Sequence, residues 1–282
     1  MEVFEMDHEK VLRFLPDRPL NSHKGDYGKI LLLCGSEGYT GAAALAAMGA
    51  LRTGAGLVYL GVPREIYEIE AVKLTEPIIF PLPGEFGMLS KDAINIIQKK
   101  LEDMDAVLLG PGMGRSDGVC EVVKFVLNEF PGPVVLDADG INVISGHKNI
   151  LRGRTSPTII TPHLGEFARF NGTVSNNPTD DAIRAAKDLG IIVVLKGYNT
   201  VITDGNTLYI NRTGNPGLAT GGSGDILAGM ILGLLGQKLP PLLSAACGVW
   251  LHGKAADICA EEIGQYGMIP SDMLNVIPRL LK

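Results

Sequence analysis

Short apolar runs alternate with stretches of helical periodicity over most of the chain. Each run is brief and rich in Ile, Leu or Val, as expected for a strand that is buried on both faces. This strand–helix alternation indicates a mostly parallel sheet with helices on both sides. The predicted strands are Lys29–Cys34, Leu57–Val62, Ala106–Leu109, Val134–Leu136, Thr158–Ile160 and Ile191–Leu195. The predicted helices between them are Gly41–Arg52, Lys91–Glu102, Gly118–Asn128, His163–Phe170 and Asp180–Leu189.

The last third of the chain departs from this alternation. Thr200–Thr203 and Thr207–Ile210 flank Asp204-Gly205-Asn206, which is typical of a hairpin turn. Apolar patterns then predict helices at Ile226–Leu235 and Leu242–Glu261. No change in composition marks a domain boundary and no internal repeat is found, so we expect residues 1–282 to form a single α/β domain.

Charge and composition narrow the class of protein. The net charge is −6 and no basic block occurs, which argues against nucleic acid as a partner. The longest apolar run, Ile226–Leu235, is about half as long as a membrane span, and the acidic N-terminus does not resemble a signal peptide. The cysteines are far apart, without a CxxC pair, and are expected to be reduced core thiols of a cytoplasmic protein. They are Cys34, Cys120, Cys247 and Cys259.

Three glycine-rich loops directly follow predicted strands. They are Gly35–Gly38, Gly110–Gly114 and Lys196-Gly197. The chain has 36 glycines, where average usage predicts about 20. The carboxyl ends of parallel strands share one edge, and open α/β sheets bind ligands there. We therefore expect a large ligand site at this edge, although any single loop could be explained by the need for glycine in a tight turn.

The strongest local signal is Gly221-Gly222-Ser223-Gly224-Asp225, at the start of the predicted apolar helix. Glycines at a helix start leave backbone N–H groups free and let an anion approach closely. Asp225 then stands beside the anion, where a carboxylate suits the task of taking a proton from a hydroxyl that attacks phosphorus. An Asp in a first helical turn also stabilises the helix dipole, so this motif alone leaves both interpretations open. P-loop, GxGxxG, GxSxG and HExxH patterns are missing from the sequence.

These residues carry a family resemblance. Gly222-Ser223-Gly224-Asp225 resembles the GxGD anion-hole signature of ribokinase-type small-molecule kinases. An ordered set of further segments is similar to one branch of that superfamily, the ADP- or ATP-dependent NAD(P)H-hydrate dehydratases. GxGD alone marks only the superfamily, whereas the ordered set specifies the branch. The segments are residues 23–29, 38–43, 52–58, 110–114, 136–140, 161–166, 194–197 and 214–222.

The resemblance implies a fold and a reaction. The fold would be a ribokinase-like three-layer α/β/α sandwich around a mostly parallel sheet, often assembled as a homotetramer. The activity would be that of an ADP-dependent (S)-NAD(P)H-hydrate dehydratase, a carbon–oxygen lyase that restores NADH or NADPH from the hydrated coenzyme and releases AMP and phosphate. ADP or ATP would be the co-substrate and Mg²⁺ the cofactor. A separate NAD(P)H-hydrate epimerase would act in the same pathway, because no fused epimerase domain precedes His23 in this sequence.

The resemblance also assigns roles to individual residues. Asp225 would be the catalytic base and would contact the substrate. The nucleotide would be held by Lys196, Gly197, Tyr198, Asn199, Thr200, Gly222, Ser223 and Gly224. The hydrated coenzyme would lie against Ala43, Gly114 and His163.

Glu166 is the candidate for the metal. It falls where sugar kinases of the superfamily have the Glu of an Asn-x-x-Glu motif near Mg²⁺, although His163 replaces the Asn.

Each of these roles has a simpler alternative. Lys196 could be a solvated surface lysine, and His163 could be a helix cap or a surface histidine. Glu166 needs no function in a first helical turn, and Ala43 and Gly114 could reflect close packing. The carboxylates of Asp137 and Asp139 also follow a strand at the ligand edge. Our default interpretation is that Asp139 is the N-cap of a helix at Gly140–Ser145.

Two other functions compete with the dehydratase. A kinase of the same fold that phosphorylates a hydroxymethylpyrimidine or thiazole alcohol would share Asp225 and the anion hole, but it would release a stable phosphoester. The coenzyme-side segments argue against it. A non-catalytic nucleotide sensor is the third candidate, and an intact Gly222-Ser223-Gly224-Asp225 argues against that, since a sensor needs no base.

Overall fold

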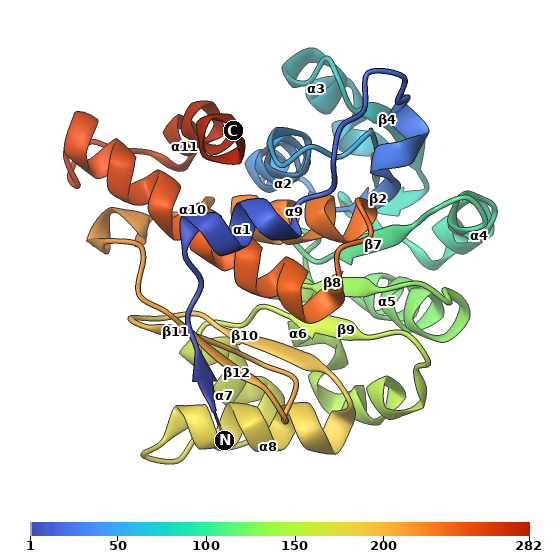
Figure 1. Ribbon diagram of the computed structural model, residues 1–282. Coiled ribbons are helices and arrows are strands. Elements are labelled where there is room, and N and C mark those ends of the chain that lie inside the picture. The colour runs from blue at the N-terminus through green and yellow to red at the C-terminus, as the bar shows by residue number, and fades with distance from the viewer. Residues whose placement is uncertain (1) are drawn as a thin grey trace.

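A ten-stranded sheet forms the centre of the computed structural model, which describes residues 2–282 (Figure 1). The strand order is β1-β12-β11-β10-β9-β8-β7-β2-β3-β4. Its strands are β1 (Val3–Phe4), β2 (Lys29–Leu33), β3 (Leu57–Pro63), β4 (Ile78–Leu82), β7 (Ala106–Leu109), β8 (Val134–Leu136), β9 (Thr158–Ile160), β10 (Ile192–Leu195), β11 (Thr200–Thr203) and β12 (Leu208–Asn211). A small hairpin of β5 (Gly84–Glu85) and β6 (Met88–Leu89) lies outside this sheet.

The helices alternate with these strands. They are α1 (His8–Phe14), α2 (Thr40–Arg52), α3 (Arg64–Lys73), α4 (Ile94–Leu101), α5 (Asp117–Glu129), α6 (Ala138–Ile144), α7 (Leu164–Asn171), α8 (Pro178–Leu189), α9 (Ser223–Gly236), α10 (Pro241–Glu262) and α11 (Pro270–Val276). Within the ten described strands only β11 runs against the others, because it pairs antiparallel with both β10 and β12. The predicted mostly parallel sheet is therefore confirmed.

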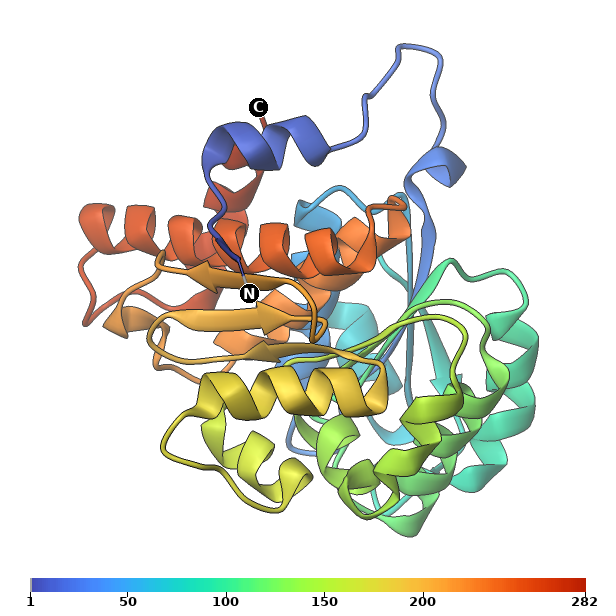
Figure 2. The same ribbon diagram turned by 60° about the horizontal axis from the view of Figure 1, so that its bottom comes forward.

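Successive side chains of the central strands enter two different cores. Leu31 and Leu33 of β2 pack with helices α4 to α8, whereas Ile30 and Leu32 pack with α2, α9 and α10. Figure 2 shows the two helical layers, with α10 (orange-red) on one side of β10–β12 and α8 (yellow) on the other. A sheet that is apolar on both faces needs such double cover. The structure is thus the predicted three-layer α/β/α sandwich.

Helices α2 and α9 approach each other unusually closely. A Cβ atom on Gly229 of α9 would lie 2.0 Å from the Ala46 carbonyl oxygen of α2. A Cβ atom on Gly49 of α2 would lie 2.6 Å from the Ile226 carbonyl oxygen of α9. Only glycine fits at both positions, and the contact fixes where α9, and therefore its first turn, lies on the sheet.

The predicted strands and helices are all present, with ends that differ by at most three residues. The sequence pattern missed β1, β4, the β5–β6 hairpin, α1, α3 and α11. Strand β4 is an edge strand that contains Pro81 and is mostly half-exposed, so it lacks the continuous apolar run of a central strand. Helix α3 is rich in charged residues, and only Ile66 and Glu70 are buried.

The cysteines and the long helices agree in part with the sequence analysis. All four thiols are free; Cys34, Cys247 and Cys259 are buried as expected, but Cys120 is only half-buried. Trp250 of α10 is also buried. No helix in the described part of the chain is long and apolar enough to cross a membrane.

Candidate active site

The glycine-rich loops come together at one edge of the sheet, as the sequence predicts. The Gly35 N–H donates to the Pro111 carbonyl oxygen at 2.8 Å and joins the loops that follow β2 and β7. The Lys196 N–H donates to the Pro162 carbonyl oxygen at 2.8 Å, and His163 pairs with Lys196 as an isolated bridge. The loops after β9 and β10 therefore continue the same edge.

Helix α9 starts at this edge and supplies the candidate anion site. Gly222 is its N-cap residue with a φ of 98°, which favours glycine. A Cβ atom there would also lie 2.5 Å from Leu45 of α2. Asp225 lies in the first turn, as expected, and Ser223 and Gly224 precede it on the helix. The free N–H groups of this turn can bind an anion.

Lys196 points at the start of α9. Its Nζ atom lies 2.9 Å from Asp137 Oδ1, and a Cβ atom on Gly224 would lie 3.1 Å from that same nitrogen. The Thr161 hydroxyl donates to the same Asp137 oxygen at 2.6 Å. Only 22% of the Lys196 side chain is exposed, so the alternative of a solvated surface lysine is wrong.

Burial and neighbouring charges adjust the acidity of this cluster. Burial raises the pKa of Asp225 to about 6, and the Asp137 and Glu166 carboxylates raise it as well, whereas Lys196 opposes them. Burial acts to lower the pKa of Lys196, but the carboxylates of Asp137, Glu166 and Asp225 together raise it. Lys196 is therefore a fixed positive charge at neutral pH, while Asp225 can give and take a proton there.

His163 and Glu166 cap helix α7. The His163 Nδ1 atom accepts from the Gly165 N–H at 3.0 Å, and the Glu166 carboxylate accepts from the His163 N–H at 2.9 Å. This reciprocal capping box confirms the helix-capping alternative for His163. It leaves the His163 Nε2 atom 3.6 Å from Glu166 Oε1.

The described residues contain no group of three or more His, Cys, Asp or Glu side chains that could hold a metal ion by themselves. Mg²⁺ is usually held by one or two carboxylates together with substrate phosphates. Glu166, which is buried and has one carboxylate oxygen outside the helix cap, fits that sparser requirement.

The loop around Gly114 is tied to the first turn of α6. The Asp139 carboxylate accepts from the Gly114 N–H at 3.0 Å and from Arg115 Nε at 2.8 Å. Our interpretation of Asp139 as an N-cap is therefore wrong: α6 begins one residue earlier than Asp139, after Asp137, and the Asp139 side chain reaches across to the neighbouring loop. Gly114 has a φ of 77°, so glycine is favoured there.

Ala43 is the one predicted site residue that is fully enclosed by protein. A Cβ atom on Gly35 would lie 2.9 Å from the Ala43 Cβ, so the two residues pack against each other beneath the first loop.

Residues 197–200 form a compact surface turn beside Lys196. The Thr200 hydroxyl donates to the Gly197 carbonyl oxygen at 3.1 Å, and Asn199 has a φ of 59°. The Tyr198 ring is 98% exposed and is available to stack on a planar ligand.

Thr161 and His252 lie at the candidate site although no pattern in the sequence predicts a role for them. Thr161 lies directly before Pro162 in the segment 161–166 that resembles the family, but nothing in the sequence shows that its hydroxyl reaches Asp137. His252 lies on α10, and a single histidine in such a long, mostly apolar helix is usually a core residue. Its Nε2 atom is nevertheless 3.0 Å from the carbonyl oxygen of Ser223 in the candidate site.

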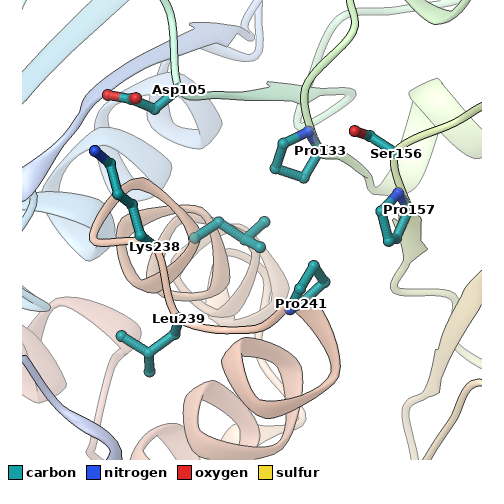
Figure 3. Close-up of a pocket in the computed structure, with 8 residues that line it drawn as sticks. Asp105, Pro133, Ser156, Pro157, Lys238, Leu239 and Pro241 are labelled. Atoms are coloured by element: carbon teal, nitrogen blue, oxygen red, sulfur yellow. The ribbon is translucent and has the colours of Figure 1, made fainter.

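A separate cavity of 270 Å³ lies at the opposite end of the sheet (Figure 3). Asp105, Pro133 and Pro157 precede β7, β8 and β9, and together with Lys238 of the α9–α10 turn they line it. The Asp105 carboxylate is already occupied by the Lys29 N–H at 2.7 Å. This cavity therefore lies at the other end of the sheet from the Asp225 cluster.

Comparisons with known proteins identify the family of the chain. The sequence model of the NAD(P)H-hydrate dehydratase family matches residues 30–279. The chain is 35% identical to the ADP-dependent (S)-NAD(P)H-hydrate dehydratase of Bacillus subtilis, over 100% of this chain and 99% of that protein. A crystal structure of the B. subtilis ADP/ATP-dependent enzyme, co-crystallized with ATP/Mg²⁺, superimposes with a TM-score of 0.82 at 32% identity, covering 97% of this chain and 96% of the other.

Longer relatives match as well. The chain is 42% identical to the bifunctional NAD(P)H-hydrate repair enzyme Nnr of Moorella thermoacetica, over 95% of this chain. It spans about half the length of such bifunctional relatives, 52% in this case. The family model covers most of the chain, and the B. subtilis relative matches along its whole length. The chain therefore belongs to the NAD(P)H-hydrate dehydratase family.

Proposed function

We propose that this protein is an ADP-dependent (S)-NAD(P)H-hydrate dehydratase, which restores NADH or NADPH from the hydrated coenzyme. The observation that carries the proposal is Asp225 in the first turn of α9, beside Lys196 and the amides of Gly222 and Gly224 at the helix start. A carboxylate with a pKa of about 6 suits a general base near neutral pH. The B. subtilis relative that matches along its whole length, an ADP-dependent (S)-NAD(P)H-hydrate dehydratase, supports this choice of substrate.

The reaction begins at the hydroxyl group of the hydrated nicotinamide ring. Hydroxide is a poor leaving group and phosphate is a good one, so the hydroxyl must first be phosphorylated. Asp225 takes the hydroxyl proton while the oxygen attacks the β-phosphorus of ADP. The bond from that phosphorus to its bridging oxygen breaks, and AMP leaves. Lys196 and the first amides of α9 stabilise the charge that develops on the phosphoryl group.

Elimination completes the repair. The lone pair of the ring nitrogen pushes out the phosphate together with the electrons of the carbon–oxygen bond. Loss of a proton from the adjacent ring carbon then restores the double bond. The products are NADH or NADPH, AMP and phosphate. The protein contributes alignment of the two substrates and exclusion of water, which would otherwise consume the nucleotide.

The two substrates occupy opposite sides of Asp225 in this proposal. The nucleotide lies against Lys196, the turn of Gly197, Tyr198, Asn199 and Thr200, and the anion site of Gly222, Ser223 and Gly224. The hydrated coenzyme lies against the Gly35 loop that covers Ala43 of α2, against the Gly114 loop and against His163. The positive φ of Gly114 and its fixed amide support a close approach of ligand to backbone on that side.

Mg²⁺ is the proposed cofactor. Glu166 would hold it together with the nucleotide phosphates, through the carboxylate oxygen that does not cap α7. When bound, the cation neutralises part of the phosphate charge.

The proposal extends to the surroundings of the enzyme. An NAD(P)H-hydrate epimerase supplies the (S) form of the hydrated coenzyme to this enzyme. The protein works in the cytoplasm, and the assembly is a homotetramer.

A direct assay tests the proposed function. Purified protein is mixed with NADH hydrate, Mg²⁺ and either ADP or ATP, and the near-ultraviolet absorbance of reduced nicotinamide is followed while AMP and phosphate are quantified. We expect absorbance, AMP and phosphate to rise in equal amounts with ADP. Asp225→Asn is the matched inactive control. A stable phosphoester of a hydroxymethylpyrimidine or thiazole alcohol would indicate a kinase instead, and nucleotide binding without any turnover would indicate a sensor.

A further inference from the structure

A buried histidine of α10, His252, forms hydrogen bonds with the first residue of α9. His252 is only 6% exposed, and its Nε2 atom lies 3.0 Å from the Ser223 carbonyl oxygen and 3.3 Å from the Ser223 hydroxyl. Ser223 is the first residue of α9 and is itself buried. A single ring nitrogen therefore faces both oxygens of the residue that follows the N-cap glycine.

The chemistry of these contacts fixes the tautomer of the ring. A carbonyl oxygen only accepts hydrogen bonds, so Nε2 of His252 must carry the proton. Burial lowers the pKa of His252 to about 4, and the charge of Lys196 acts in the same direction, although the Ser223 carbonyl opposes them. The ring is therefore neutral at physiological pH and offers Ser223 a hydrogen-bond donor without a charge.

The direction of the Ser223 hydroxyl follows from this tautomer. With the Nε2 proton pointing toward Ser223, the hydroxyl oxygen can only accept from His252. The hydroxyl proton is then left for a different acceptor. Ser223 lies between Gly222 and Gly224 in the anion site, where that acceptor would be a phosphate oxygen.

We propose that His252 is a positioning residue for the nucleotide phosphates: its Nε2–H holds the Ser223 carbonyl and hydroxyl, and it leaves the Ser223 hydroxyl proton to bind a phosphate oxygen. This inference rests on the proposed function, in that the start of α9 is taken to bind ADP. It explains why an imidazole is buried on α10, since the donor must reach α9 through the packing between α9 and α10.

Two substitutions of His252 separate positioning from packing. His252→Leu removes the donor and keeps an apolar filler, and His252→Gln keeps an N–H donor near the Nε2 position. We expect His252→Leu to weaken ADP binding, measured by titration calorimetry, about tenfold, the factor expected for losing one hydrogen bond of this kind. His252→Gln should recover affinity to within about threefold of the wild type.

A matched control uses the other histidine that binds a distant carbonyl. His8 Nε2 lies 2.9 Å from the Leu280 carbonyl oxygen, and the His8 ring stacks on Trp250 rather than on a residue of the candidate site. His8→Leu should lower the melting temperature without changing ADP affinity. If His252→Leu also lowered only the melting temperature, with ADP affinity and turnover unchanged at 25 °C, the positioning role would be refuted.

A double-mutant cycle tests the route through Ser223. Ser223→Ala removes the hydroxyl, so His252→Leu should then have less than a threefold further effect on ADP affinity. Independent, multiplying effects of the two substitutions would overturn the proposed route. If His252→Leu does not fold, ¹⁵N NMR of the wild-type imidazole decides instead, because a ring protonated on Nδ1 rather than Nε2 contradicts the proposal.

The calorimetric arm also distinguishes this inference from the proposed function. Wild-type protein that binds ADP but never restores NADH would refute the dehydratase and leave the His252 comparison intact. Wild-type protein that binds neither ADP nor ATP would overturn both.

Discussion

Lys196 Nζ lies 2.9 Å from Asp137 Oδ1, and that carboxylate oxygen also accepts the Thr161 hydroxyl at 2.6 Å. The lysine is thus held in place at the start of α9 by a partner that is almost fully buried. A lysine fixed in this way loses little further side-chain entropy when a phosphate arrives. Asp137 therefore sets the position of the Lys196 ammonium group at the start of α9.

Removing the lysine should weaken nucleotide binding in particular. We expect Lys196→Ala to lower ADP affinity by about 1.5–3 kcal/mol, as for the loss of a hydrogen bond to a charged group. Affinity for the hydrated coenzyme should change much less. Calorimetric titration of each substrate measures both effects. Lys187→Ala, an exposed lysine on α8, is the matched control. Equal ADP affinity in Lys196→Ala and the wild type would contradict the assignment.

Asp225 should destabilise the folded protein when it is ionised. Its folded pKa of about 6 is above the ordinary value of 3.8, so the folded state binds the proton more tightly than the unfolded state. Stability is therefore lost as pH rises from about 4 to about 6, and the loss is complete above that range. Asp225→Asn escapes this loss and should be more stable than the wild type at pH 8, by about 1–3 kcal/mol.

Chemical denaturation at several pH values measures that difference. The advantage of Asp225→Asn should shrink toward zero as the pH approaches 4. An Asn variant that is less stable than the wild type at pH 8 would mean that the helix-dipole contribution of Asp225 outweighs its burial.

Ionisation of the Asp225 carboxylate should determine how kcat/KM depends on pH. A general base must be ionised, so kcat/KM should rise about tenfold per pH unit below pH 6 and level off above it. Asp225→Asn should lose this dependence and turn over about 10²–10⁴ times more slowly. Histidine side chains in general also titrate in this pH range, so His163→Asn is the control. In that variant the rise of kcat/KM with pH must persist. A flat profile in His163→Asn would transfer the role of the base to the histidine.

The coenzyme side can be tested separately from the nucleotide side. Asp139 holds the Gly114 amide at 3.0 Å and Arg115 at 2.8 Å, so Asp139→Ala should loosen that loop. We expect KM for the hydrated coenzyme to rise about five- to tenfold, with ADP affinity unchanged, as for one or two lost hydrogen bonds. Steady-state kinetics with each substrate varied in turn gives both values. A change confined to ADP would show that Gly114 does not face the coenzyme.

The contact between α2 and α9 should tolerate no added methyl group. Gly229→Ala would place Cβ 2.0 Å from the Ala46 carbonyl oxygen, so we expect a loss of about 1–3 kcal/mol or more from overpacking. Urea denaturation measures it. Gly146→Ala is the control, since a Cβ atom there meets no atom within 4 Å. Equal stabilities of the two variants would show that the helices can separate freely.

Much of the fold could be predicted because the central strands and the helices between them have clear periodicity. Ala106–Leu109 and Val134–Leu136 are uninterrupted apolar runs, and both strands have those ends in the structure. Strand β4 and the β5–β6 hairpin could not be found, because they lie at the margin of the sheet, contain Pro81 and Gly84, and depend on pairing with distant segments.

The candidate site could be predicted where the residues that carry the chemistry are close together in the sequence. Gly222–Asp225 has both its glycines and its carboxylate within one helical turn. The contact of Lys196 with Asp137 spans 59 positions and that of His252 with Ser223 spans 29, so no local pattern shows either. Local sequence is misleading for Asp139 for the same reason. Its position before a predicted helix indicated an N-cap, whereas its hydrogen-bond partner, the Gly114 N–H, lies 25 residues away.

The backbones of α2 and α9 touch at Gly49 and Gly229, and this contact has a consequence for substrate choice. Helix α9 carries Asp225 at one end of the contact, and α2 begins after Tyr39, which packs against Gly112 of the loop on the other side. In the proposed function, the span between the nucleotide and coenzyme halves is therefore set by two rigid main chains rather than by adjustable side chains. A hydroxyl held slightly too far from the phosphorus could not be brought nearer, so we expect a near-miss substrate to be rejected by the dimensions of the scaffold itself.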